Sequence, residues 1–231
     1  MIPLKNIDSY SNATYVYSKS NEIIKTIYNL KILLIGNSGV GKTSLLNRYI
    51  TNSFNPNHFC TLTAENKIKS INIDSSTSAK VTLWDTAGQE KYRSLTKSFF
   101  LNTNGVILMY DVCNNNSFEG LKMWLDDIKD YTKYEDISII LVGNKIDLEE
   151  RCINYEVANE FAQNNDMLYC ETSSKEGINV ESPFEKITKE IVEKIRRKQK
   201  FEKEVNENIS INTTNAVKGK DFANENRFKC C

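Results

Sequence analysis

One short stretch of the sequence, residues 36–43, has residue types and spacing suited to holding a chain of phosphates. It reads Gly-Asn-Ser-Gly-Val-Gly-Lys-Thr and fits the pattern G-x-x-x-x-G-K-[ST] at every fixed position. Glycines let the backbone curl so that several N–H groups face one anion. Lys42 supplies a mobile positive charge, and the Thr43 hydroxyl is a natural magnesium ligand. The apolar run 30–35 before the loop and the helical pattern after it predict the strand and the helix N-terminus that such a loop requires.

Three further polar loops follow apolar runs of strand length. In open α/β sheets, ligands lie at the carboxyl ends of the strands, so the four loops are predicted to meet at one edge. The three loops are 84–90, 143–147 and 171–175, after the runs 80–84, 138–142 and 167–170.

The elements that must position these loops alternate between strand patterns and helix patterns, which favours a mostly parallel sheet with helices on both faces. The runs 66–73 and 80–84 are the exception, because the turn-rich segment 74–79 between them leaves no room for a helix. We therefore predict an α/β, P-loop NTPase fold: a mostly parallel six-stranded sheet with one antiparallel edge hairpin. The other predicted strands are 30–35, 105–110, 138–142 and 167–170, and the predicted helices include 117–132, 155–164 and 184–197.

The composition describes an ordinary globular protein of 231 residues, 40% hydrophobic and 26% charged. Its formal net charge of zero gives no general attraction to nucleic acid. No stretch is long and apolar enough for a transmembrane helix, the N-terminus does not resemble a secretory signal, and Met1-Ile2 does not fit N-myristoylation. Four of the six cysteines are scattered and His58 is the single histidine, which disfavours structural zinc or a disulfide framework and favours reduced thiols in the cytosol.

With these motifs in view, the sequence resembles a small GTPase of the Ras superfamily, and most closely its Rab branch. The resemblance covers residues 30–197 and the final Cys230-Cys231. It implies a GTPase domain at 30–197. The segments on either side have few core-forming residues and no periodicity, so we expect a flexible extension at 1–29 and a disordered tail at 198–231. Ile23, Ile24 and Ile27 are apolar enough to extend the first strand.

The resemblance also assigns roles to single residues. Asp85 and Gly88 match D-x-x-G, Gln89 matches the glutamine that orients the attacking water, and Thr61 matches the switch threonine. The implied catalytic residues are Gln89, Lys42 and Thr61, and the implied magnesium ligands are Thr43, Thr61 and Asp85. The implied contacts to GTP or GDP come from Asn37, Ser38, Gly39, Val40, Gly41, Lys42, Thr43, Ser44, Phe54, Thr61, Asp85, Gly88, Asn144, Lys145, Asp147, Ser173, Ser174 and Lys175.

Base selection follows from one of these elements, Asn144-Lys145-Ile146-Asp147, which matches N-K-x-D. A carboxylate accepts two hydrogen bonds from the N1–H and the exocyclic amine of guanine, and adenine offers no such pair. Asn144 is expected to tie this loop to the phosphate loop. Ser173-Ser174-Lys175 is similar to S-A-K, with serine in place of alanine.

The terminal Cys230-Cys231 is similar to the pair that Rab proteins carry for double geranylgeranylation, and two lipid chains give stable anchoring. The resemblance therefore implies a protein on the cytoplasmic face of an endomembrane, with a cytosolic pool, that regulates vesicle traffic. The partners it implies are effectors, an exchange factor, a GTPase-activating protein, and prenylation and membrane-extraction factors.

Two segments depart from the Rab pattern. Residues 62–66 read Leu-Thr-Ala-Glu-Asn where Rab proteins usually have I-G-V-D-F, so Asn66 replaces a phenylalanine of the effector surface. Residues 99–102 depart from the usual aromatic-arginine-glycine sequence. Three alternatives stay open at this point: a GTP-binding scaffold with negligible hydrolysis, a Ras-like signalling GTPase, and a P-loop kinase or ATPase.

Overall fold

The computed structural model describes residues 13–18, 23–56, 65–86 and 97–221. The chain forms two units, Met1–Ile191 and Val192–Cys231, which we describe separately.

A seven-stranded sheet, counted over the described residues, organises the first unit. Its central strand β2 (Ile23–Ile35) is parallel to β4 (Thr77–Asp85) and to β5 (Gly105–Asp111). Two more parallel strands, β6 (Ser138–Asn144) and β7 (Leu168–Thr172), continue beyond β5. At the other edge β3 (Glu65–Asn72) runs antiparallel to β4, as the short connection predicts. The predicted α/β fold with a mostly parallel sheet is confirmed.

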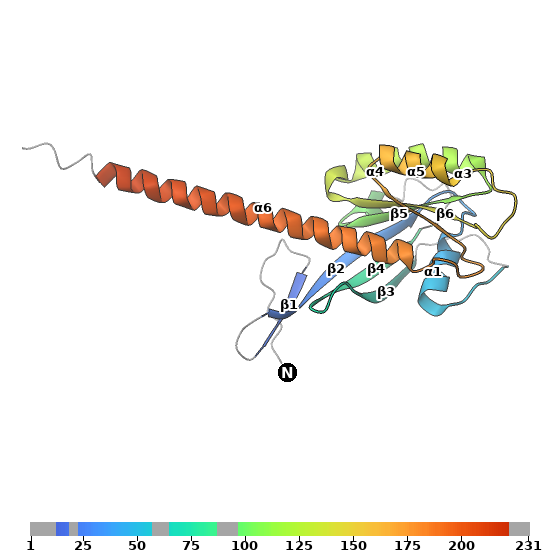
Figure 1. Cartoon of the computed structure of the whole chain (residues 1–231), viewed down its shortest axis with the longest axis horizontal. Coiled ribbons are helices and arrows are strands. Elements are labelled where there is room, and N and C mark those ends of the chain that lie inside the picture. The colour runs from blue at the N-terminus through green and yellow to red at the C-terminus, as the bar shows by residue number, and fades with distance from the viewer. Residues whose placement is uncertain (1–12, 19–22, 57–64, 87–96, 222–231) are drawn as a thin grey trace, which may run out of the picture. The chain divides into compact units, whose positions relative to one another are not determined.

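Helices cover both faces of this sheet. Figure 1 shows the helices α3 (Asn115–Glu119), α4 (Leu121–Tyr131) and α5 (Tyr155–Asn164) together on one face. The other face packs against α1 (Lys42–Thr51) and the first turns of α6 (Ser182–Asp221). The rings of Tyr49 on α1 and Phe184 on α6 stack with their centroids 3.8 Å apart. Two short helical segments, α2 (Lys97–Phe100) and η2 (Tyr134–Asp136), complete the described elements.

The core lies on both sides of β2, because successive strand residues point to opposite faces. Leu33 and Ile35 are fully buried in the cluster that contains α4 and α5. Ile32 and Leu34 are equally buried on the opposite face. This double burial holds the carboxyl end of β2, where the phosphate loop begins, in a rigid setting.

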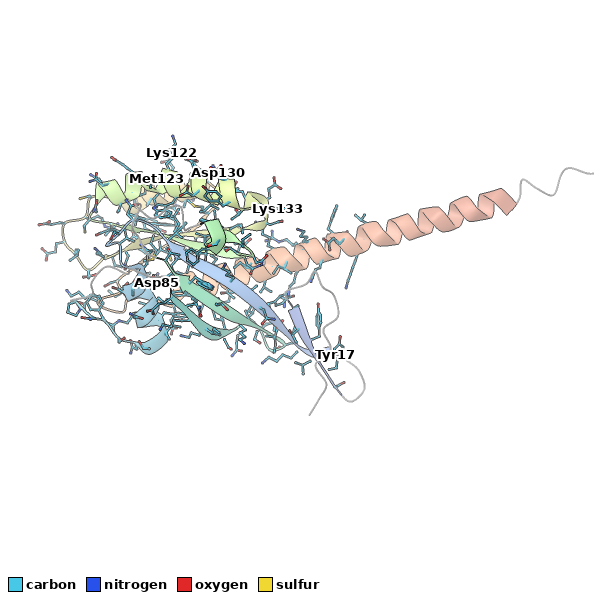
Figure 2. The ribbon with its side chains drawn as sticks, turned by 180° about the vertical axis from the view of Figure 1, so that it is seen from behind. Tyr17, Asp85, Lys122, Met123, Asp130 and Lys133 are labelled. Carbon is cyan, nitrogen blue, oxygen red and sulfur yellow. The ribbon has the colours of Figure 1, made fainter. Side chains whose placement is uncertain are left out.

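The N-terminal region differs from the expected flexible extension. The strand β1 (Ala13–Tyr17) pairs antiparallel with β2, which begins at Ile23 and not at residue 30. The sheet therefore has a seventh strand and a second antiparallel pair. The segment 23–27 extends the first predicted strand, as its apolar residues allowed, whereas β1 was not expected. Ala13 and Tyr28 are buried, so the pairing removes apolar surface from water. Figure 2 shows Tyr17 of β1 at the end of the sheet opposite Asp85.

The C-terminal region also differs from expectation, because α6 continues to Asp221 where we expected disorder after residue 197. Lysine, glutamine and glutamate are good helix formers, and Lys200 and Glu204 approach to 4.0 Å at i,i+4 spacing. Among the residues that the structure describes, no helix combines the length and the apolar content needed to cross a bilayer.

Candidate functional site

The phosphate loop connects β2 to α1 and depends on glycine at two positions. Gly41 has φ +99°, and a Cβ there would run into the side-chain amide of Asn144. Gly36 has φ +138°, and a Cβ there would run into the carbonyl of Met109 on β5. Both conformations are strained for residues with side chains. The glycine spacing is therefore required by the backbone and by the neighbours of the loop.

Lys42 and Thr43 are the first two residues of α1 and directly follow this loop. Lys42 is only 5% exposed, and its Nζ donates to the carbonyls of Gly36 at 2.8 Å and Asn37 at 2.9 Å. The ammonium group is therefore held against the loop that is expected to carry phosphate.

A pair of oxygen atoms beside the loop has the chemistry that magnesium prefers. The Thr43 hydroxyl donates to a carboxylate oxygen of Asp85 at 2.5 Å, and Asp85 is 3% exposed at the end of β4. Figure 2 labels Asp85 at this end of the sheet. Hydroxyl and carboxylate oxygens are hard ligands, so these two residues fit a bound Mg²⁺.

Asn144, at the end of β6, joins the phosphate loop to the loop after β7. Its Nδ2 donates to the carbonyl of Val40 at 2.9 Å. Its Oδ1 accepts from the Thr172 hydroxyl at 3.0 Å, and from the backbone N–H and hydroxyl of Ser174 at 3.2 and 3.0 Å. Because Asn144 is 1% exposed, these bonds are shielded from water.

Asp147 lies in the next turn and has a side chain that is only 7% exposed. The Ser173 hydroxyl donates to its Oδ1 at 2.6 Å, and the Lys175 ammonium lies 3.8 Å from its Oδ2. Lys145 adopts a left-handed conformation, with φ +71°, and its ammonium is 2.7 Å from a carboxylate oxygen of Asp111. The Asp147 carboxylate that was predicted to select the base and Lys145, another predicted nucleotide contact, therefore lie in one loop of the site.

These groups enclose a cavity of about 360 Å³, within the range that holds small ligands. Its lining combines phosphate-loop residues with residues of the loops after β6 and β7. The lining residues are Ser38, Gly39, Gly41, Lys42, Thr43, Ser44, Phe54, Asn55, Pro56, Thr86, Asn144, Lys145, Asp147, Leu148, Ser174 and Lys175.

Comparison with known proteins identifies the family. The model of the Ras family matches residues 31–193. GTP-binding protein YPT1 of Saccharomyces cerevisiae is 42% identical over 167 residues, which cover 72% of this chain and 80% of that protein. Ras-related protein RABA5c of Arabidopsis thaliana is 35% identical over 205 residues, 88% of this chain and 94% of that protein. Ras-related protein Rab-18-B of Danio rerio is 42% identical over 164 residues, 71% of this chain and 80% of that protein. The chain belongs to the Rab family of small GTPases.

The structure of this Rab protein gathers most of the predicted contact residues around the cavity, and their roles toward the nucleotide stay predictions. Asn37 differs, because its side chain turns to α4, where Oδ1 accepts from the Trp124 indole N–H at 2.9 Å. The Asn37 side-chain oxygen is therefore bonded to α4 of the protein itself. Thr61, Gly88, Gln89, Cys230 and Cys231 lie outside the described residues.

Sequence motifs did not reveal three residues that shape this Rab site. Thr172 supports Asn144, Trp124 holds the side chain of Asn37, and Arg48 donates to the carbonyls of the 173–175 loop. Thr172 directly precedes the predicted loop, which is a usable signal. Arg48 and Trp124 carry no comparable signal, because their partners are distant in the sequence.

Arg151, which follows the 144–147 loop, is bonded to Glu171 of β7, the strand that leads into the 173–175 loop. The Arg151 guanidinium donates to both carboxylate oxygens of Glu171 at 2.8 Å, and Tyr169 adds a third hydrogen bond at 2.8 Å. Burial raises the pKa of the Glu171 carboxyl, but the bonds from Arg151 and Tyr169 outweigh burial and hold this pKa below its ordinary value. The pair therefore stabilises the fold while Glu171 is ionised.

Arg151→Gln is expected to lower the free energy of unfolding by about 1 kcal/mol at pH 7. A lowered pKa in the folded state stabilises above the ordinary glutamate pKa and loses this effect as pH falls through the folded-state value. The difference between wild type and variant should therefore shrink on acidification below about pH 4.5. Urea unfolding across this pH range measures it, with Lys67→Gln of the exposed Lys67–Glu65 pair as control. An equal difference at all pH values would contradict the assignment.

Proposed function

We propose that this Rab protein binds GTP and GDP with Mg²⁺ in the described cavity, hydrolyses GTP slowly, and directs vesicle traffic through nucleotide-dependent effector binding. The observation that carries the proposal is the placement of the Asp147 carboxylate and the phosphate loop around one cavity, joined by Asn144. A phosphate-binding loop that contains a buried lysine, together with a carboxylate that can select guanine, suits a guanosine phosphate.

Each side chain has a proposed task in this reaction. Lys42 neutralises charge on the phosphates, and Asp147 selects guanine. Thr43 and Asp85 hold magnesium, which supplies further positive charge to the phosphate oxygens when bound. Thr61 contacts the terminal phosphate and Gln89 orients the attacking water, both assigned from the sequence motifs. Loss of that phosphate is expected to release the segments 54–66 and 88–98, of which 57–64 and 88–96 lie outside the described residues, and so to change the surface that effectors contact.

Single-turnover hydrolysis by purified protein tests the catalytic part of the proposal. Wild type loaded with GTP should release phosphate slowly, and Gln89→Leu should abolish that release while nucleotide binding persists. A wild type that binds GTP without releasing phosphate would instead support a GTP-binding scaffold. Efficient displacement of GTP by ATP would contradict guanine selectivity and return the protein to another class of P-loop enzyme.

We propose that effectors meet a surface in which one apolar position has become polar. Asn66 of β3 stands directly opposite Trp84 of β4, and the Trp84 ring lies 5.8 Å from that of Phe99. The Lys31 ammonium lies 5.3 Å above the Trp84 ring. The resulting patch supports partners that combine an apolar contact at Trp84 with a hydrogen bond at Asn66.

Membrane attachment is proposed to use two geranylgeranyl groups that prenylation factors add to Cys230 and Cys231. Membrane-extraction factors would return the lipidated protein to the cytosol. A tagged protein should then concentrate on an endomembrane and exchange with a cytosolic pool. Cys230→Ser with Cys231→Ser should move it to the cytosol in cell fractionation. Unchanged membrane recovery of this double variant would contradict lipid anchoring at the pair.

A further inference from the structure

Arg48 connects the helix that follows the phosphate loop to the loop that is proposed to hold the base. It lies in the last turn of α1, four residues before Asn52 ends the helix. Its Nε donates to the Ser174 carbonyl at 2.9 Å, and its Nη2 donates to the Lys175 carbonyl at 2.6 Å. Its Nη1 donates to the Asn52 carbonyl at 3.0 Å. The planar guanidinium is therefore fixed to the end of its own helix through Asn52, and it also donates to the two neighbouring carbonyls of Ser174 and Lys175.

The turn 173–178, which Arg48 contacts, is closed by a backbone pair between its first and last residues. Hydrogen bonds to two of its carbonyls therefore fix the orientation of the whole turn. The backbone groups of Ser173 and Ile178 exchange hydrogen bonds at 3.0 Å in both directions. The N–H and C=O of one trans peptide point in opposite directions. Because Arg48 holds the Ser174 carbonyl, the N–H of Lys175 points away from Arg48. Lys175 lines the cavity and Arg48 does not.

The same guanidinium also supports the aromatic wall of the cavity. Its central carbon lies 5.9 Å from the centroid of the Phe54 ring, which lines the cavity. An arginine over an aromatic face is an attractive contact that restricts the ring. This side chain of α1 thus joins the 173–178 turn, which is distant in sequence, to Phe54, which follows α1 closely.

We propose that Arg48 is a positioning residue that slows nucleotide release by holding the base-binding turn and Phe54 in place. The proposal rests on the guanine nucleotide site proposed above. Arg48 does not line the cavity itself, so its effect passes through the lining residues Ser174, Lys175 and Phe54. Pre-organised groups lose less entropy on binding, so removing the grip should raise the dissociation rate and leave the chemistry at the phosphate end unchanged.

Release of a fluorescent GDP analogue, chased with excess GDP, tests this proposal on the full-length protein. Arg48→Ala should release nucleotide at least about tenfold faster than wild type. Arg48→Lys keeps the charge but not the fork and should fall between the two. Thr51→Ala is the matched control, because Thr51 lies on the same helix and its hydroxyl bonds to Asn47 and Ser53, away from the 173–178 turn.

A second measurement separates positioning from general damage. Single-turnover hydrolysis of preloaded GTP should stay within about twofold of wild type in Arg48→Ala. The fold acceleration of release by EDTA should also be unchanged, because it reports the metal and phosphate end. The proposal would be overturned if Arg48→Ala released the GDP analogue at the wild-type rate, or if Thr51→Ala accelerated release equally. It would also be overturned if Arg48→Ala slowed GTP hydrolysis as strongly as it accelerated nucleotide release. Failure of wild type to bind the analogue would overturn the proposed function instead.

Discussion

Asn144→Ala is expected to lower the free energy of unfolding by about 3 kcal/mol and to weaken GDP binding by about 100-fold. The side chain serves one carbonyl, one backbone N–H and two hydroxyls, and all of them lose their partner in the variant. Buried polar groups that lose a partner cost more than an average hydrogen bond gains. The phosphate loop and the 173–175 turn would also lose their shared contact.

Thermal unfolding and calorimetry with GDP measure these two effects. Asn144→Asp is an informative companion, because it keeps an acceptor for Thr172 and Ser174 but places an oxygen against the Val40 carbonyl. It should bind GDP weakly while losing less contact to the 173–175 turn. Asn164→Ala, at an exposed position of α5, is the matched control. Stability and affinity of Asn144→Ala equal to this control would refute the role of Asn144 as a connector.

Asp147→Asn is expected to reduce GDP affinity by about 1,000-fold while leaving the fold stable. The carboxylate would lose its acceptor function toward both donors of the guanine edge, whereas an asparagine oxygen can still accept from the Ser173 hydroxyl. Xanthine carries a carbonyl where guanine carries its amine, so the new amide should favour xanthosine diphosphate.

Competition binding with GDP and xanthosine diphosphate tests this reversal. Asp130→Asn, exposed on α4 and labelled in Figure 2, controls for the loss of one negative charge. A variant that lost affinity for both nucleotides would point to a damaged site. Retained preference for GDP would show that Asp147 does not select the base.

Sequence reasoning succeeded where the determinants are local. The strand β2, the glycine loop and α1 follow one another directly between Ile23 and Thr51, and Gly41 is needed for its own backbone angle. The positions of Asn144 and Asp147 follow from one apolar strand and the turn after it. These features depend on neighbours in the sequence and could be predicted from it.

Tertiary partners could not be predicted in this way. Arg48 finds carbonyls 126 and 127 residues away, and no pattern of side chains encodes a bond to a backbone group. The strand β1 was missed because its polar, tyrosine-rich neighbourhood shows no regular alternation, and its stability comes from pairing with β2. The helix beyond residue 197 was missed because low hydrophobicity favoured disorder, while its lysines and glutamates favour a helix.

The early start of β2 has a consequence for any shortened form of the protein. Residues 26–29 pair with Thr77–Lys80 of β4, so a chain cut at residue 30 would leave that stretch of β4 with a bare hydrogen-bonding edge. Such edges recruit strands from other molecules. Truncation would also uncover Ala79, which is fully buried. The N-terminal part of β2 thus covers an edge of β4 that could otherwise pair with a strand of another molecule.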